Sequence, residues 1–394
     1  MGKVEIDHTG SGSGITLSSD GTSLLLDGTA IGGGGGGGDP DLYRDNASSA
    51  TTPVASGTNA VSIGSNSTAT GTAAVAIGQG DGDATGDYAF AVAGQATNTG
   101  AISIGTSSAA NGFKSVSLGA DSRASGTRGV AIGANAQAIS GANATAIADS
   151  YASGTDSFAA AIGNNSSSYG ATGANSVAMG YQAKASGQYA YAGGSLSTAS
   201  GYGSISIGIS STASGHSSIA LGGRGVWNAQ ATAQSSIAIG DGARSTVKGK
   251  MAFAGYGMGN AGSQGSWYTL YSDTTDATAE AMTTTKSTAS SDNQIVLPNN
   301  SAFAFHGTIV ARQQASGGTA SAAWKIEGLI RREGSVGTTT LVNSATTVLD
   351  NTPSWGMALS ADTTNGCLKI EVTGAASTNI RWVATIHTSE VTYA

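Results

Sequence analysis

The chain has 394 residues, of which 61 are glycine and 10% are charged, and its formal net charge is −7. This negative balance, with no basic block in the sequence, excludes nucleic acid as the main partner. The one cysteine, Cys367, excludes an intrachain disulfide and a cysteine metal cluster, so stability must come from packing and assembly.

The N-terminal residues predict an attachment segment and a linker. The opening MGKVEIDHTG lacks the apolar run of a usual signal peptide, and no stretch reaches the roughly 18 to 20 apolar residues of a membrane helix. We therefore expect no membrane insertion, and assembly in the cytoplasm. Ile15–Gly28 predicts a β-hairpin with Asp20-Gly21 in its turn, which makes residues 1–31 an attachment segment. Seven consecutive glycines cannot hold structure without partners and predict a Gly-rich linker over residues 32–56.

A four-residue phrase, apolar–small–apolar–glycine, dominates residues 57–265. It is written VSIG, VAIG or IALG, and most neighbouring copies lie 14 residues apart. A second glycine often follows seven residues after the first. Recurrence at such a period is typical of a stacked, repetitive architecture. The phrase begins at Val61, Val75, Phe90, Ile102, Val116, Val130, Thr145, Ala160, Val177, Tyr191, Ile205, Ile219, Ile237 and Met251.

The repeat favours a parallel β-roll over a coiled coil. Two glycines in every 14 residues would cost a helix about 1 kcal/mol each relative to alanine, and paired e/g charges are lacking. The alternation in Val61-Ser62-Ile63 predicts a short strand with one buried face, and Gly64 permits the positive φ of a sharp turn. Each repeat is then one coil with two short strands, stacked about 4.8 Å from the next. Residues 57–265 are predicted to form about fourteen such coils, a narrow rod.

The interior of this roll is expected to hold Val, Ile, Ala and Ser, with glycine at the corners. The predicted core and corner residues are Val61, Ile63, Gly64, Gly71, Val75, Ile77, Gly78, Val116, Leu118, Gly119, Gly126, Val177, Met179, Gly180, Gly187, Ile205, Ile207, Gly208, Gly215, Ile237, Ile239 and Gly240. So small a coil buries few side chains, and we therefore expect a homo-oligomer.

Two irregularities interrupt the repeat. Phe90, Tyr191 and Phe253 stand where other coils have Val or Ile, and we expect packing to loosen or rearrange there. The stretch GGRGVWNAQAT lengthens one interval and predicts an excursion that carries Arg224 and Trp227.

The phrase NSVAMGYQAKASG, with its many relatives along the chain, resembles the head domain of trimeric autotransporter adhesins. The resemblance covers about half of the chain. It implies a left-handed parallel β-roll in which three chains pack side by side, and an adhesive or spacer role at a surface. In contrast to that family, we expect no secretion signal, no coiled-coil stalk and no membrane-anchor barrel in this sequence.

Residues 266–394 predict a different domain, an antiparallel β-sandwich of jelly-roll-like form. Four of the five tryptophans lie here. Trp324 and Trp382 sit within alternating strands and are expected in the core, whereas Trp355 is expected near a loop. The predicted strands are WYTLYS, TAEAMTTT, AFAFHGTIVARQ, SAAWKIEGLIRR, TTTLVNSATTVL, SWGMALSA, CLKIEVTG and IRWVATIHTSEV.

Taken together, the segments resemble tail fibres and related appendages of tailed phages, and the two ends are similar to those of structural proteins of marine phages. This resemblance implies a homotrimeric structural protein of the virion, assembled in the host cytoplasm. It would attach to other virion proteins through its N-terminal segment and contact a host cell-surface glycan or protein through its distal part.

Candidate sites in the sequence are few. Asp81, Asp83 and Asp87 cluster at a predicted turn and are weak candidates for calcium ligands. Trp355, Arg331 and Arg332 are weak candidates for receptor contacts. The four histidines are scattered, with no metal-binding spacing, and we expect no cofactor and no catalytic residue.

Three other functions remain open. The same chain could be a head fibre or capsid decoration protein, or a bacterial surface adhesin. A tailspike-like polysaccharide depolymerase would need two carboxylates about 5 to 10 Å apart in a groove. The predicted roll contains few acids, so we expect that the protein is not an enzyme.

Overall fold

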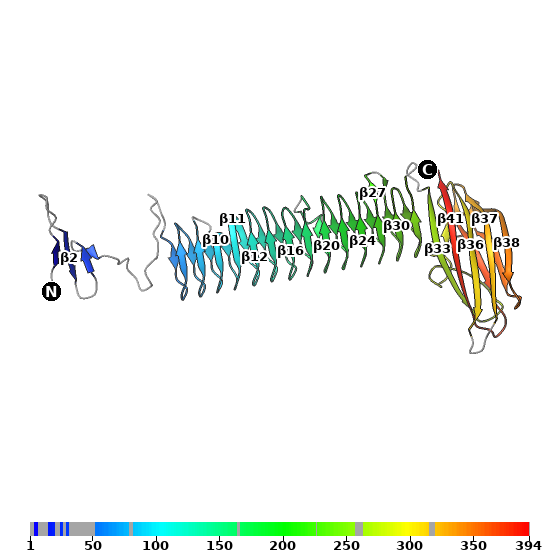
Figure 1. Cartoon of the computed structure of the whole chain (residues 1–394), viewed down its shortest axis with the longest axis horizontal. Helices are drawn as coiled ribbons and strands as arrows, with labels where there is room; N and C mark the ends of the chain where they lie inside the picture. Colours follow the sequence, from blue (N-terminus) through cyan, green and yellow to red (C-terminus); the bar gives the residue numbers. More distant parts are fainter. Residues whose placement is uncertain are drawn as a thin grey trace. The chain divides into compact units, whose positions relative to one another are not determined.

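The computed structural model describes residues 52–78, 82–163, 166–225, 227–256, 263–314 and 320–393, together with four N-terminal strands. Contacts divide the chain into two compact units, residues 1–122 and 123–394. Strands dominate both units, and the one helical segment among the described residues is the 3₁₀ turn Val336–Thr338 (Figure 1). The all-β prediction is confirmed.

The N-terminal strands form a small antiparallel sheet in the order β1-β2-β3-β4. The pairing of β2 with β3, which opposes Leu17 to Leu26, confirms the predicted hairpin. The turn at Asp20-Gly21 and the seven glycines lie outside the described residues. The strands are β1 (Val4–Ile6), β2 (Ile15–Ser19), β3 (Leu24–Leu26) and β4 (Thr29–Ala30).

The first compact unit contains the first coils of a parallel β-roll. Each coil has a first strand, which carries the repeated phrase, and a second strand after the turn, and both stack in register on the next coil. The first strands are β6 (Val61–Ile63), β8 (Val75–Ile77), β10 (Phe90–Ala96), β11 (Ile102–Ala110) and β12 (Val116–Leu118). The second strands are β5 (Val54–Ala55), β7 (Thr68–Ala69) and β9 (Asp83–Ala84), and β10 and β11 run on into this position.

The second compact unit contains the remaining coils, which brings the total to about fourteen. Its first strands are β14 (Val130–Ile132), β16 (Thr145–Ile147), β18 (Phe158–Ala160), β20 (Val177–Met179), β22 (Tyr191–Gly193), β24 (Ile205–Ile207), β26 (Ile219–Leu221), β30 (Ile237–Ile239) and β32 (Met251–Phe253). Its second strands are β13 (Arg123–Ala124), β15 (Gln137–Ala138), β17 (Tyr151–Ala152), β19 (Gly170–Ala171), β21 (Lys184–Ala185), β23 (Thr198–Ala199), β25 (Thr212–Ala213), β29 (Gln230–Ala231) and β31 (Arg244–Ser245). The predicted excursion is a hairpin of β27 (Gly223–Arg224) and β28 (Trp227–Asn228).

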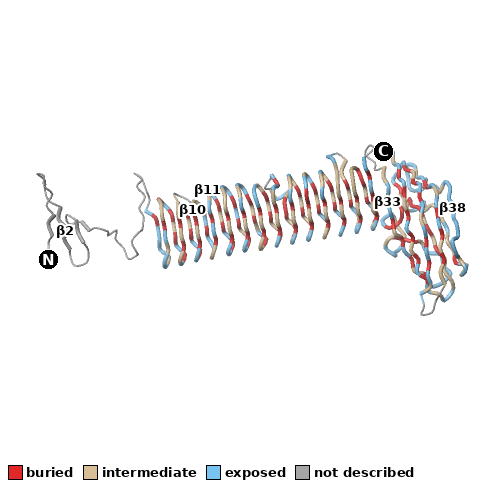
Figure 2. Tube along the Cα trace, in the orientation of Figure 1, coloured by how far each residue is buried: buried red, intermediate tan, exposed pale blue. Residues whose placement is uncertain are grey.

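The interior of the roll is narrower than the sequence analysis expected. The middle residue of every first strand is Ala or Ser and is buried, as Ala178 and Ser206 are, whereas its larger neighbours are half-buried or exposed. Figure 2 shows buried stretches recurring along the coils. Placing Val and Ile in the core was therefore wrong for the single chain. The buried side chains at these positions are therefore only methyl or hydroxymethyl groups. Where serines replace alanines they pair, as the hydroxyls of Ser206 and Ser211 do at 2.8 Å.

The two glycines of each coil serve different purposes. The glycine that ends the phrase has positive φ, for example +114° at Gly180, which confirms the predicted turn. The second glycine is required by stacking instead, because a Cβ atom on Gly187 would lie 2.1 Å from the carbonyl oxygen of Gly201 in the next coil.

The prediction that one copy of the phrase begins at Ala160 is wrong by two residues. The strand of that coil is Phe158–Ala160, which pairs with Val177–Met179, and not a strand beginning at Ala160. Ile162 turns inward in this coil and is fully buried, the one branched residue among alanines in its cluster. Because a shift of two residues preserves the alternation, the sequence pattern alone could not separate the two registers.

Residues 263–393, which we call the sandwich, form two antiparallel sheets. The larger sheet has the order β33-β41-β36-β37-β38, and in the smaller sheet β40 pairs with β39, β34 and β35. All eight predicted strands are present, and β41 returns from the chain end to lie between β33 and β36. The strands are β33 (Gln264–Thr274), β34 (Ala279–Ala281), β35 (Ile295–Val296), β36 (Ser301–Gln313), β37 (Ser321–Arg332), β38 (Thr340–Asp350), β39 (Gly356–Asp362), β40 (Cys367–Thr373) and β41 (Ile380–Thr392).

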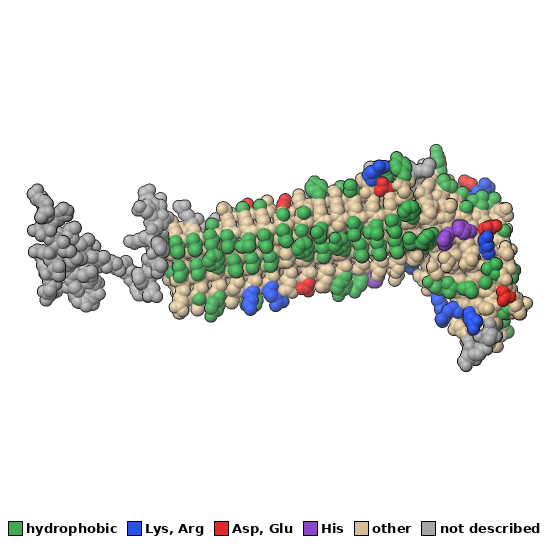
Figure 3. Space-filling model, viewed as in Figure 1, with side chains coloured by type: hydrophobic (Ala, Val, Ile, Leu, Met, Phe, Trp, Pro, Cys, Tyr) green, Lys and Arg blue, Asp and Glu red, His purple; other side chains and the backbone are tan. Residues whose placement is uncertain are grey.

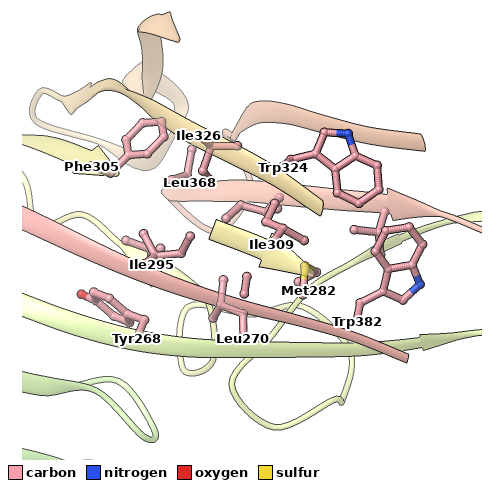
Figure 4. Close-up of a cluster of buried hydrophobic side chains, with 14 of the residues drawn as sticks. Tyr268, Leu270, Met282, Ile295, Phe305, Ile309, Trp324, Ile326, Leu368 and Trp382 are labelled. Atoms are coloured by element: carbon pink, nitrogen blue, oxygen red, sulfur yellow. The ribbon is translucent and has the colours of Figure 1, made fainter. Parts of the chain in front are cut away.

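The sandwich has a large apolar core, unlike the roll. Trp324 and Trp382 stack with ring centroids 5.7 Å apart, as expected of core residues, and Ile309 and Leu270 pack beside them (Figure 4). The indole N–H of Trp382 donates to the hydroxyl of Thr274 at 2.9 Å, so its polar atom is satisfied.

The last coil of the roll is joined directly to the sandwich within the second compact unit. Strand β32 pairs antiparallel with β33, so that Met251 opposes Trp267. Val247, at the last corner of the roll, is fully buried in the sandwich core. The sandwich thus covers the C-terminal end of the roll, which repeat proteins require because a terminal repeat lacks a neighbour.

Candidate functional site

Two columns of apolar side chains run along the outer face of the first strands. The parallel register places the first residue of each strand above the first residue of the next, and the third above the third. The first column contains Val61, Val75, Phe90, Ile102 and Val116 in the first compact unit, and Val130, Thr145, Phe158, Val177, Tyr191, Ile205, Ile219, Ile237 and Met251 in the second. The second column contains Ile63, Ile77, Val92, Ile104 and Leu118, and then Ile132, Ile147, Ala160, Met179, Gly193, Ile207, Leu221, Ile239 and Phe253.

These columns, which we call the apolar stripe, are far from buried. Met179 and Ile207 are each 43% exposed, and nearly every other member is half-buried or exposed. Figure 3 shows hydrophobic side chains gathered in this band over the roll. A soluble monomer rarely exposes so large an apolar surface, which marks the stripe as an interaction surface.

Two of the large residues in the stripe, Tyr191 and Phe158, share their strand with a small one. The ring of Tyr191 lies over Gly193, where a Cβ atom would be 3.0 Å from the ring. Phe158 shares its strand with Ala160, which stands where the two adjoining coils have Ile147 and Met179. The expected loosening at Tyr191 therefore does not occur inside the roll, since the bulky ring stays on the outside.

A buried polar cluster lies where the roll meets the sandwich. The ammonium group of Lys250 is 3.0 Å from a carboxylate oxygen of Glu390, and both side chains are almost wholly buried. Gln264 donates to the same oxygen at 2.8 Å, while Thr388 and Tyr268 donate to the other at 2.8 and 3.2 Å. This cluster ties the last coil of the roll to β33 and β41.

The charges of this cluster shift each other's pKa values. Burial raises the pKa of Glu390, but the nearby Lys250 charge and hydrogen bonds from Gln264 and Thr388 outweigh it and hold the pKa below its ordinary value. Burial lowers the pKa of Lys250, and its attraction to Glu390 offsets only part of that change. Sequence reasoning missed both residues. The available signal was that every other coil has Ala, Ser or Gly at the position of Lys250.

A polar hollow opens on the side of β33. It is lined by Tyr271, Ser272, Asp273, Glu280 and Lys286, among other residues. Asp273 pairs with Lys286 and, at 3.3 Å, with Arg381, and Ser272 donates to Glu280 at 3.2 Å. Burial raises the pKa of Asp273, yet hydrogen bonds from the two cations lower it overall. The hollow offers an aromatic ring beside hydroxyl, carboxylate and ammonium groups.

The predicted receptor residues differ in their surroundings. Trp355 was a poor candidate, because it is only 5% exposed and packs against Trp382 in the core. Arg332 donates to the carbonyl oxygen of Leu297 at 2.6 Å and helps to hold the β37 end in place. Arg331 is exposed, with Glu333 3.9 Å away.

A second hollow brings the two arginines together with an aromatic residue. Arg331 and Arg332 line it with Asn300, Val391 and the exposed ring of Tyr393. Arginine and tyrosine side by side can contact the charged group and the ring face of an acidic sugar.

The described calcium candidates, Asp83 and Asp87, are not part of a metal-binding cluster. Asp81 lies outside the described residues, and Asp83 lies within the short strand β9. The carboxylate of Asp87 accepts the backbone N–H of Thr72 at 2.8 Å, which fastens one coil to the next. Among the described residues, no group of three or more His, Cys, Asp or Glu side chains is placed to hold a metal ion.

Comparisons with known proteins bear on the roll. The family model of the YadA head domain repeat matches residues 55–80, 110–136, 124–147, 171–197, 199–224 and 227–243, less than half of the chain. The chain therefore carries repeats of the trimeric autotransporter adhesin head type. A search of curated proteins gives no match. No helix in the described parts of the chain is long and apolar enough to cross a membrane.

Two phage tailspikes are among the similar solved structures. The tailspike protein of Acinetobacter phage vB_ApiP_P1 is 8% identical, with a TM-score of 0.21, and the match covers 82% of this chain. The tailspike gp49 of Acinetobacter baumannii bacteriophage Fri1, a capsular polysaccharide depolymerase, is 10% identical, with a TM-score of 0.19 over 86% of this chain. The matches span 59% and 66% of the lengths of those two proteins. TM-scores this low do not establish a shared fold.

Proposed function

We propose that the protein is a homotrimeric fibre of a phage virion that mediates attachment to the host surface. The observation that carries the proposal is the apolar stripe, which repeats in register with the coils and is half-exposed in the single chain. The N-terminal segment would bind other virion proteins, and the sandwich would contact the host.

The repeat spacing of the stripe favours a second copy of the same chain as its partner. Its side chains recur once per coil, about 4.8 Å apart, and only a surface with the same spacing can match them along the whole roll. A parallel copy of the roll has that spacing. The YadA head repeats favour three copies, each with its stripe facing a common axis. Closed symmetry then buries the stripe of every copy to the same extent.

The mass of the purified chain in solution tests the trimer. We expect light scattering to give three times the chain mass of 38.3 kDa. Ile207→Asp should reduce the trimer fraction strongly, because it would place a charge in a closed apolar interface. Leu196→Asp is a matched control, since Leu196 is also 43% exposed but lies outside the stripe. A monomeric parent protein, or equal effects of the two variants, would refute the proposal.

Host contact is proposed at the two hollows of the sandwich, for an acidic glycan. Arg331 and Tyr393 in one, and Tyr271 and Lys286 in the other, supply cations beside aromatic rings. Binding to host polysaccharide should weaken at least tenfold in Arg331→Ala or in Tyr271→Ala, depending on which hollow is used. Lys325→Ala changes an exposed cation outside both hollows and should have no effect.

A depolymerase is the second candidate, because Asp273 and Glu280 line one hollow together. The lowered pKa of Asp273 keeps it ionised and opposes a role as the general acid. Release of new reducing ends from host polysaccharide, lost in Glu280→Gln, would establish the enzyme.

The place of the protein on the particle separates the remaining alternatives. Antibodies to the sandwich should label the tail of intact virions in electron micrographs. Labelling of the capsid would favour a head fibre or decoration protein, and labelling of a bacterial surface would favour an adhesin.

A further inference from the structure

The apolar stripe does not end with the roll. In the second compact unit, antiparallel pairing carries each column onto the larger sheet of the sandwich. The first column continues from Met251 to Trp267, then to His387, His306 and Glu327. The second continues from Phe253 to Gly265, Ser389, Ala304 and Leu329.

These residues face outward, on the side of the sheet away from the core. Directly opposed residues in an antiparallel pair point to the same side, and their neighbours along the strand point to the other. The neighbours Tyr268, Phe305 and Ile386 are all buried in the core, while Trp267 is 54% exposed. Within the second compact unit, the stripe and this sheet surface are thus one face of one continuous β-sheet.

The chemistry of the face changes at the junction. The Trp267 ring stacks on His387 with centroids 5.2 Å apart, and His387 lies 5.2 Å from His306. Beside this row the second column becomes small and forms a shallow groove, floored by Gly265, Ser389 and Ala304. Figure 3 shows histidine side chains where the hydrophobic band reaches the sandwich.

We propose that the part of this outer face next to the roll, which contains Trp267, His387, His306 and the groove, is a second self-association surface, occupied by the sandwich of a neighbouring copy of the chain. The inference rests on the proposed trimer. A partner that pairs with the stripe through the last coil must continue along the same sheet surface, because β32 and β33 are hydrogen-bonded neighbours. The groove between Phe253 and Leu329 can accept a bulky side chain from that copy, such as its Trp267.

This surface also makes the contact sensitive to pH, unlike the contact of the stripe. The stripe contains no titratable side chain other than Tyr191, whereas each copy would bring two imidazoles to the interface. Glu327 opposes His306 across the strands, and Lys325 and Arg331 lie farther along the same face of β37. Asp273 and Arg381 lie on the same face toward the far end of β33 and β41. Acid adds positive charge to imidazole side chains, so the like-charged sandwiches should separate at pH 5 while the rolls stay together.

Cross-linking tests the surface itself. In full-length protein at pH 7.5, Ala304→Cys should be joined between copies by a short bis-maleimide reagent. Ala358→Cys, exposed on the smaller sheet, should not be joined, and the native Cys367 is buried. If scattering shows a trimer but Ala304→Cys stays unlinked, this inference is wrong and the proposed trimer stands. If the parent protein is monomeric, the proposed function fails first.

Fluorescence tests the pH response. Between pH 7.5 and pH 5, acrylamide quenching of the parent protein should rise at least twofold, and Trp267→Phe should remove this rise. The double variant His306→Gln/His387→Gln should keep the pH 7.5 level at both values, and His306→Gln alone should shift the midpoint. Quenching that is unchanged in the parent, or changes equally in the histidine variants, would overturn the pH response.

Discussion

At the scale of the residue, the buried pair of Lys250 and Glu390 links two distant parts of the chain. A buried ion pair contributes little net stability, because desolvation of both charges opposes their attraction. Removing one member is different, since it leaves the other charged in a dry site. The pair also spans 140 residues of sequence, so it fastens the roll to the sandwich.

Lys250→Met should therefore lower the free energy of unfolding by about 3–5 kcal/mol, measured by urea denaturation. Adding Glu390→Gln should recover part of the loss, because the unpaired charge is then gone. Lys248→Met is the matched control. Lys248 lies 3.8 Å from Asp292 in an exposed pair, and its loss should cost no more than about 1 kcal/mol.

The lowered pKa of Glu390 also sets a pH dependence. A carboxylate whose pKa is lower in the folded state stabilises the fold above its unfolded value of about 4.3, and this contribution is lost as the pH falls through the folded value. Acid titration below about pH 4.3 should destabilise the parent more than the Lys250→Met/Glu390→Gln variant. Parallel titration curves for the two proteins would contradict this assignment.

At the scale of the element, the coil leaves room for small side chains only at most of its inner positions and at its stacked corners. The middle residue of each first strand is Ala or Ser, and at the corners glycines of successive coils lie close together. An added side-chain atom at such a glycine would have to displace backbone atoms of the next coil, which cannot move aside as a flexible side chain can.

Gly187→Ala should destabilise the roll by about 1–3 kcal/mol or more, since the new methyl group would lie 2.1 Å from the Gly201 carbonyl oxygen. The midpoint of urea unfolding measures the effect. Gly255→Ala places the same methyl group in open space, and its free energy of unfolding should change by less than about 0.5 kcal/mol. Similar shifts for both variants would show that loss of glycine alone, and not stacking, is responsible.

At the scale of the whole molecule, stability should depend on assembly. The stripe gains burial only when copies meet, so the folded state is favoured by higher protein concentration. The roll core contains little beyond alanine and serine, whereas the sandwich buries Trp324, Trp382 and their neighbours.

The melting temperature should accordingly rise by about 1–3 °C for each tenfold increase in protein concentration, as calorimetry can measure. Ile207→Asp should reduce this dependence, because it weakens the stripe contact. A melting temperature that stays constant over a hundredfold range would contradict self-association of the folded chain.

The sequence by itself determined the coils, the turn glycines and the strands of the sandwich, because each is encoded by a local pattern that repeats or alternates. It also indicated a thin interior. Only the tertiary structure decided which face of the alternation lies inside, since Val61-Ser62-Ile63 is compatible with either choice and the width of the coil excludes the branched residues. Trp355 lies in a loop as expected, but it is buried because its ring packs on Trp382 of β41, which only long-range pairing brings near. The contact of Lys250 with Glu390, and the passage of the stripe onto Trp267 and His387, depend on strands far apart in the chain, and no local pattern can encode that meeting.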